Sequence, residues 1–276
     1  MRILLWTHWT DLDTPEERAA NLGAAERWGA AGVKIDFMDS DSQERYGWYD
    51  DVLADTAARH LLVNFHGSTI PHGIQRTWPH VVSMEAVYGG EQGDVTAADM
   101  ATLPFTRNVV GSMDFTPMGF QFGTHRVSEA AELATSVVYE SGFQHYAGSI
   151  EAYRARPELE RFLEQVPTVW DETRLVSGRP GDAATFARRD GHRWFLGSLG
   201  AGPAITRHAR WTSSAAAGGG WRWCATAPTG WSGTAGWPTG TTPWTSRSRP
   251  TAASPRSSAR LNPPAPPATS RCAACR

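Results

Sequence analysis

Five polar residues in the first 91 positions lie within short apolar runs, at their ends or in the loop that follows one, and their side chains are of the types that catalytic and metal sites use. They are Lys34, Asp36, His66, Glu85 and Glu91. Two carboxyl groups that face one another can act as nucleophile and general acid, or they can bind a hard cation that prefers oxygen ligands. These residue types therefore indicate either acid–base chemistry or cation binding.

Asp36 lies between Ile35 and Phe37. In an extended strand its side chain therefore points away from both neighbours and shares a face with Lys34. Asp36 is then either a site residue on that face or a strand-end carboxylate that caps the following helix. Both functions stay open at this point.

Glu85 and Glu91 enclose a loop in which two consecutive glycines permit a sharp turn. Such a pair suits a calcium ion or an acid–base role, and a solvated surface loop also explains it. His66 follows an apolar run. It is either a strand-end histidine with satisfied hydrogen bonds or, at the mouth of a barrel, a partner for a sugar hydroxyl.

Strands alternate with helices in the segments that must position these residues. The apolar pattern predicts strands at 3–7, 33–38, 61–65 and 81–85, and helices at 15–28, 44–60, 127–139 and 158–166. Alternation at this spacing is typical of parallel βαβ units, hence of an α/β fold that is either a doubly wound sheet or a (β/α)8 barrel. In a barrel the active site is built at the carboxyl ends of the strands, where Asp36, His66 and Glu85 stand.

The pattern changes after Trp170. Two alternating segments flank Asp190-Gly191, a dipeptide that is typical of tight β-hairpins. We therefore expect a partial (β/α)8 barrel in residues 1–170 and the start of an antiparallel β domain in residues 171–203.

The net charge of −2 for the 276 residues hides two very different parts. Residues 1–203 hold all 28 acidic residues and 17 of the 26 basic ones, so their net charge is −11. Residues 204–276 hold the other nine basic residues, all arginines, and their net charge is +9. With one isoleucine and one leucine, this low-complexity tail has too few aliphatic side chains for a core.

Three explanations of the tail stay open. It is a basic, tryptophan-bearing segment for single-stranded nucleic acid, a disordered extension, or a GC-rich coding sequence translated out of frame. We favour the frameshift-like explanation and expect no nucleic-acid partner.

Membrane and export signals are also absent from the sequence pattern. No apolar stretch reaches 18 residues, so we expect no membrane span. The first residues contain no signal-peptide core, so the localisation stays unknown.

Several ordered motifs in residues 1–200 carry a family resemblance. They are Val33–Asp39, Val63–Gly67, Arg76–His80, Glu85–Gln92, Leu103–Pro117 and Pro167–Thr173. In this order they resemble the signature of glycoside hydrolase family 97. That family holds α-glucosidases and α-galactosidases with an N-terminal β-sandwich, a central (β/α)8 barrel, a C-terminal β domain and active-site calcium. Intact relatives are expected to be periplasmic or secreted.

The resemblance implies a retaining mechanism. Retaining members, which resemble α-galactosidases, keep an aspartate nucleophile at the end of the lysine-bearing strand, and Asp36 stands there. Inverting members place a glutamate base after the histidine of the next strand, where this chain has Gly67. We therefore expect Asp36 to be the nucleophile and Glu91 the general acid and base. An α-glucosidase of the same family is the alternative.

The remaining expectations also follow from the resemblance. It implies calcium ligands at Glu85 and Glu91, substrate contacts at Lys34 and His66, and an oligosaccharide or other α-glycoside as substrate. The family's β-sandwich and first barrel strands have no counterpart before Met1, so we expect an incomplete barrel that is inactive alone. An inactive, truncated remnant is thus the contrasting alternative.

Overall fold

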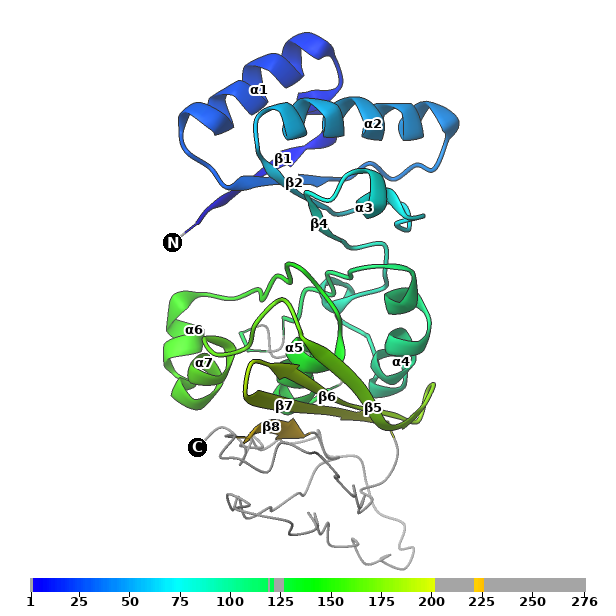
Figure 1. Cartoon of the computed structure of the whole chain (residues 1–276), viewed down its shortest axis with the longest axis vertical. Coiled ribbons are helices and arrows are strands. Elements are labelled where there is room, and N and C mark those ends of the chain that lie inside the picture. Colours follow the sequence, from blue (N-terminus) through cyan, green and yellow to red (C-terminus); the bar gives the residue numbers. More distant parts are fainter. Residues whose placement is uncertain (1, 119, 122–126, 202–220, 226–276) are drawn as a thin grey trace, which may run out of the picture. The chain divides into compact units, whose positions relative to one another are not determined.

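The computed structural model describes residues 2–118, 120–121, 127–201 and 221–225 (Figure 1). These residues divide into two compact units, which are described separately. The first comprises Met1–Val95, Leu103–Met118 and Tyr139–Gly148, and the second comprises Thr96–Thr102, Gly119–Val138 and Ser149–Arg276. Every helix among the described residues is too short or too polar to cross a bilayer.

A four-stranded parallel sheet forms the centre of the first unit, with its strands in chain order. The strands are β1 (Leu4–His8), β2 (Gly32–Asp36), β3 (Leu62–Phe65) and β4 (Val81–Met84). The connections contain α1 (Pro15–Arg27), α2 (Gln43–Ala58) and the short α3 (Ile74–Thr77) (Figure 1). The predicted alternation of strands and helices in an α/β fold is confirmed here.

Local sequence signals explain where the long helices begin. Thr14 and Glu17 form a reciprocal capping box at the start of α1, with Pro15 in the first turn. Ser42 accepts a hydrogen bond from the backbone of Arg45 and so caps α2. Both helices therefore start at residues whose side chains replace missing backbone partners.

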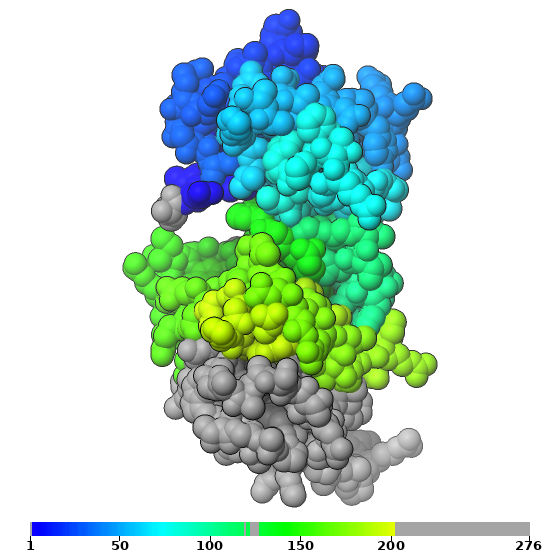
Figure 2. Space-filling model, in the orientation of Figure 1, coloured from blue at the N-terminus to red at the C-terminus, as the bar shows by residue number. Residues whose placement is uncertain are grey.

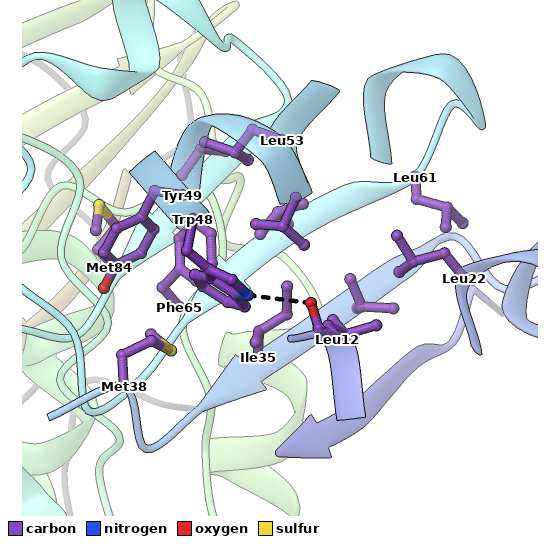
Figure 3. Close-up of a cluster of buried hydrophobic side chains, with 14 of the residues drawn as sticks. Leu12, Leu22, Ile35, Met38, Trp48, Tyr49, Leu53, Leu61, Phe65 and Met84 are labelled. Carbon is purple, nitrogen blue, oxygen red and sulfur yellow. Dashed lines mark hydrogen bonds between the residues drawn. The ribbon is translucent and has the colours of Figure 1, made fainter. Parts of the chain in front are cut away.

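The apolar residues of β2 and β3 pack against the helices in one continuous core (Figure 3). Ile35 and Phe65 are fully buried, and the indole N–H of Trp48 in α2 donates to the carbonyl oxygen of Leu12. Because side chains alternate along a strand, the neighbours of these apolar residues face the other side of the sheet. That second face carries the polar residues.

The polar face is set by the strand register. Lys34 of β2 lies opposite Trp6 of β1 and Asn64 of β3, and Asn64 lies opposite Ser83 of β4. A single parallel bridge joins Met84 to Met113, which extends the sheet beyond β4 by one residue pair. This bridge brings the segment after Met113 to the same edge.

The second unit is built on a sheet in the order β5-β6-β7-β8. Its strands are β5 (Glu172–Arg179), β6 (Ala183–Asp190), β7 (Arg193–Gly200) and β8 (Trp221–Ala225). The first three pair antiparallel, and β8 pairs parallel with β7. Residues of the antiparallel strands reach the molecular surface on the face shown in Figure 2, and most of β5 is exposed.

The predicted hairpin is confirmed, because Asp190 pairs with Arg193 across a turn in which Gly191 has a φ of 58°. The helices of this unit are α4 (Ala97–Thr102), α5 (Glu129–Val138), α6 (Ile150–Arg154) and α7 (Pro157–Leu163). Helix α5 packs closely on β7, since a Cβ on Gly197 would meet the Val137 Cβ at 2.8 Å.

The described residues also contain short 3-10 helices, namely η1 (Trp9–Leu12), η2 (Gly90–Gln92), η3 (Leu103–Phe105) and η4 (Arg107–Val110). Strand β8 falls in the segment that the sequence assigned to a tail, 204–276. The rest of that segment lies outside the described residues.

Candidate active site

The predicted site residues gather at the carboxyl edge of the parallel sheet. Asp36 ends β2, His66 directly follows β3, and Glu85 directly follows β4. His66 Nδ1 lies 3.7 Å from Glu85 Oε2 and 3.4 Å from Glu91 Oε2. Parallel strands thus place these residues together although about fifty positions separate the first from the last.

Both oxygens of the buried Asp36 carboxylate accept hydrogen bonds. The Trp6 indole N–H donates to Oδ2 over 3.0 Å, and the Phe37 backbone N–H donates to Oδ1 over 2.8 Å. Phe37 has a φ of 65°, which is uncommon for a bulky residue, and this sharp turn ends the strand. The helix that follows is capped by Ser42, so Asp36 is not its cap.

Gly67 packs directly under the turn after Asp36. Its φ is 51°, and a Cβ there would lie 2.8 Å from the Phe37 nitrogen and 2.9 Å from the Phe37 Cα. The Gly67 N–H donates to Glu85 Oε2 over 2.8 Å. Glycine is therefore required by both the backbone conformation and the close approach.

Glu85 and Glu91 sit in different electrostatic surroundings. Burial raises the pKa of Glu85, and the charges of Glu91 and Asp36 raise it further against the opposing effects of His66 and Gly67. For Glu91, whose side chain is 43% exposed, the hydrogen bond with His66 lowers the pKa. The two carboxyl groups thus differ in how readily they hold a proton.

His66 is enclosed by carboxylates on both sides of its ring. Burial lowers the pKa of His66, but hydrogen bonds to Asp114 and Glu91 outweigh it and raise the pKa to about 9. Nε2 lies 2.7 Å from Asp114 Oδ2, and Nδ1 faces Glu91 and Glu85. The ring is therefore an imidazolium at neutral pH that donates from both nitrogens.

Two further site residues, Asp114 and His145, were missed from the sequence. Asp114 follows the Met113 bridge and is fully buried. It stands between two buried apolar residues, the same pattern that singled out Asp36, and this signal could have found it. His145 lies in a segment between helices and carries no such signal.

Two groups of side chains in the described residues converge closely enough to hold a cation. They are His66, Glu85 and Glu91, and His66, Asp114 and His145. In the first group, burial and the charges of Glu91 and Asp36 make Glu85 reluctant to ionise although the His66 ring lies 3.7 Å away, so a bound cation would relieve the remaining repulsion. Two carboxylates supply part of the oxygen ligand set that calcium prefers, and they fit this ion.

Comparison with known proteins shows that two family models match the chain. Residues 1–87 match the family model described as Glycoside hydrolase 97, and residues 169–219 match the one described as Glycosyl-hydrolase 97 C-terminal, oligomerisation. The chain belongs to glycoside hydrolase family 97. The second match extends past residue 203, where the sequence placed the start of the tail.

Two curated relatives are similar over most of the chain. A probable retaining alpha-galactosidase of Streptomyces bingchenggensis is 59% identical over 210 residues, which is 74% of this chain and 32% of that protein. A retaining alpha-galactosidase of Bacteroides thetaiotaomicron is 29% identical over 71% of this chain and 32% of its own length. The chain thus spans about a third of these relatives.

Solved structures share the fold. A beta-arabinopyranosidase has a TM-score of 0.71 at 30% identity, over 79% of this chain and 39% of that one. A family 97 enzyme variant from Pseudoalteromonas sp. strain K8 has a TM-score of 0.67 at 22% identity, over 75% and 38% of the two chains. The second of these supports the fold alone.

Proposed function

We propose that this chain carries the catalytic carboxylates of a retaining α-galactosidase. The observation that carries the proposal is the position of Asp36. It ends β2, both of its oxygens are held by hydrogen bonds, and it shares the carboxyl edge with Glu85 and Glu91. The names of the two curated relatives favour the galactoside and the retaining outcome.

In the first step, an oxygen of Asp36 attacks the anomeric carbon and forms a covalent glycosyl ester. The bond from that carbon to the leaving oxygen breaks, and Glu91 gives this oxygen a proton. The hydrogen bonds from Trp6 and Phe37 keep the carboxylate in one orientation, so little reorganisation is needed before the attack.

In the second step, the ionised Glu91 takes a proton from a water molecule. The resulting oxygen attacks the anomeric carbon, and Asp36 leaves as a carboxylate. Two inversions at the same carbon give net retention.

The lowered pKa of Glu91 sets a condition on the first step, because a general acid must be protonated. His66 Nδ1, which carries an N–H proton, lies 3.4 Å from Glu91 Oε2 and is positioned to share that proton. The charge of Lys34 also lowers the pKa of Glu91, which supports a role of this ammonium group at the site. Lys34 and His66 are the proposed substrate contacts, as the sequence predicts.

Calcium is proposed as the cofactor, with Glu85 and Glu91 as ligands. When bound, it would supply positive charge that offsets the crowded carboxylates and would hold substrate oxygens. The proposal rests on the convergence of these two side chains and on the raised pKa of Glu85.

We also propose that the parallel sheet of the first unit is part of a (β/α)8 barrel. Support comes from the parallel register, the helical connections and the polar face opposite the core. An α-glucosidase is the alternative function, since a family 97 neighbour from Pseudoalteromonas is described in complex with panose.

The Streptomyces relative provides the test of the mechanism. ¹H NMR of aryl α-galactoside hydrolysis is expected to show α-galactose first, and an aryl α-glucoside is expected to react much more slowly. Glycine at the position that aligns with Asp36 should lower turnover by about 10⁴-fold. Azide should then restore cleavage and yield the β-galactosyl azide. Initial release of β-galactose would refute the retaining mechanism, and preference for the glucoside would favour the alternative.

A further inference from the structure

Asp114 forms hydrogen bonds with two histidines, and the ring nitrogens of these histidines differ in accessibility. The His66 side chain is 2% exposed, and both of its ring nitrogens face carboxylates. The His145 side chain is 27% exposed, and its Nδ1 lies 2.5 Å from Asp114 Oδ2. Within the part of the chain that the structure describes, His145 Nε2 has no hydrogen-bond partner. His145 therefore offers the more accessible ring nitrogen.

We propose that His145 Nε2 binds a hydroxyl group of the sugar substrate and that Asp114 positions the ring for this contact. The inference rests on the proposed glycosidase function and names a further substrate-binding residue of the same site.

Asp114 fixes the tautomer of His145. Burial raises the pKa of Asp114, but the hydrogen bonds from His145 and His66 outweigh it and hold that pKa well below the usual range. The ionised carboxylate only accepts, so His145 Nδ1 must donate. In the neutral ring Nε2 is then an acceptor, as in other carboxylate–histidine pairs.

The His145 ring is also held mechanically. Its own backbone N–H donates to Asp114 Oδ1 over 2.9 Å, so main chain and ring are anchored to one carboxylate. The rings of Phe143 and His66 pack edge-on against it, with centroids 4.7 Å and 5.3 Å away. A ring fixed in this way loses little entropy when a ligand binds.

The surroundings favour a hydroxyl over a metal ion. N–H groups of Asn64, His66 and His145 all converge on Asp114 Oδ2, and a cation at this point would meet their hydrogens. His145 Nε2, by contrast, is an acceptor in the neutral ring, and a polyhydroxylated ligand supplies O–H donors.

The first experiment needs no substitution. Long-range ¹H–¹⁵N NMR of the full 276-residue chain, at a pH where the ring is neutral, should show His145 protonated at Nδ1 and bare at Nε2. Methyl α-D-galactopyranoside should shift the Nε2 resonance. A bare Nδ1, or an Nε2 resonance that does not respond while the sugar binds, overturns the proposal. A response to Zn²⁺ but not to the sugar also overturns it.

Two variants extend the test. H145F keeps a planar aromatic ring but removes both nitrogens, and it should weaken sugar binding, measured by calorimetry, about tenfold. D114N keeps the ring but removes the negative charge and one of the two acceptor oxygens, so the preference for a proton on Nδ1 should fall in the NMR spectrum and binding should weaken similarly. H60N, at an exposed turn away from the sheet edge, is the matched control and should bind as the parent does.

The outcomes separate this inference from the proposed function. Equal affinity in H145F and the parent overturns the role of His145 and leaves the catalytic carboxylates untouched. Absence of sugar binding by the parent overturns the inference. The retention measured for the Streptomyces relative is a separate result and decides the proposed function.

Discussion

The guanidinium of Arg107 lies 2.8 Å from the carbonyl oxygen of Met84, the residue immediately before Glu85. The same buried side chain donates to the carbonyl oxygens of Ala86 and Gly111 over 3.1 Å and 3.0 Å. The backbone on both sides of Glu85 is thus tied to one cation. Burial lowers the pKa of Arg107, but only to about 10, so the group remains charged at neutral pH.

R107K should therefore destabilise the fold by about 2–3 kcal/mol, because an ammonium group cannot reach three carbonyls with the geometry of a guanidinium. Urea unfolding followed by circular dichroism measures the loss. R27K, at an exposed position near the end of α1, serves as the control. Equal stability of the two variants would show that Arg107 does not secure the Glu85 loop.

Calcium should bind to the chain and raise its unfolding temperature, because the ion would offset the like charges around Glu85. E85Q replaces the carboxylate by a neutral amide with little change in volume. The calcium affinity, measured by calorimetry, should fall at least tenfold. E16Q, on an exposed face of α1, should leave it unchanged. Calcium binding that survives in E85Q would remove Glu85 from the ligand set.

G67A should destabilise the fold by roughly 1–3 kcal/mol more than G29A. Both glycines have positive φ, so both variants suffer backbone strain, but a Cβ on Gly29 meets nothing within 4 Å. Only Gly67 adds the clash with Phe37. Comparison of the two free energies of unfolding isolates this clash, and equal values would mean that the turn moves aside freely.

His80 should make stability fall as the pH drops below about 6.5. Burial lowers the pKa of this ring, which packs beside Thr56 and Trp78. Between the two pKa values the unfolded chain binds more protons than the folded one, so stability is full above the unfolded value and is lost below it. H80Q should flatten the pH profile of unfolding from pH 7.5 to 5.5. An unchanged profile would contradict the assignment.

The parallel sheet was largely predictable from the sequence. Runs such as 61–65 are apolar and bounded by turn or helix signals, and the observed β3 differs from that prediction by one residue. Helices α4 and α6 were not predicted, because five or six residues are too few to show a helical period. Sheet register depends on contacts between distant segments, which one sequence does not reveal.

The candidate site was predictable only where a strand pattern exposed it. Asp36, His66 and Glu85 end recognisable apolar runs, and the structure brings them to one edge. Asp114 has apolar neighbours on both sides, as Asp36 has, but only a single-pair bridge precedes it, so no predicted strand drew attention to it. His145 is placed by its hydrogen bonds to Asp114, a contact across 31 positions. The contact between Asp114 and His145 therefore depends on the tertiary structure.

The close contact between Gly67 and Phe37 also limits the evolution of this site. A glutamate at 67, the base that resemblance assigns to inverting relatives, would need the space that the turn after Asp36 occupies. This substitution alone would therefore disturb the turn that holds the Asp36 carboxylate in place. A change from retention to inversion at this site therefore needs a new backbone path at residues 37–39 as well as the new glutamate.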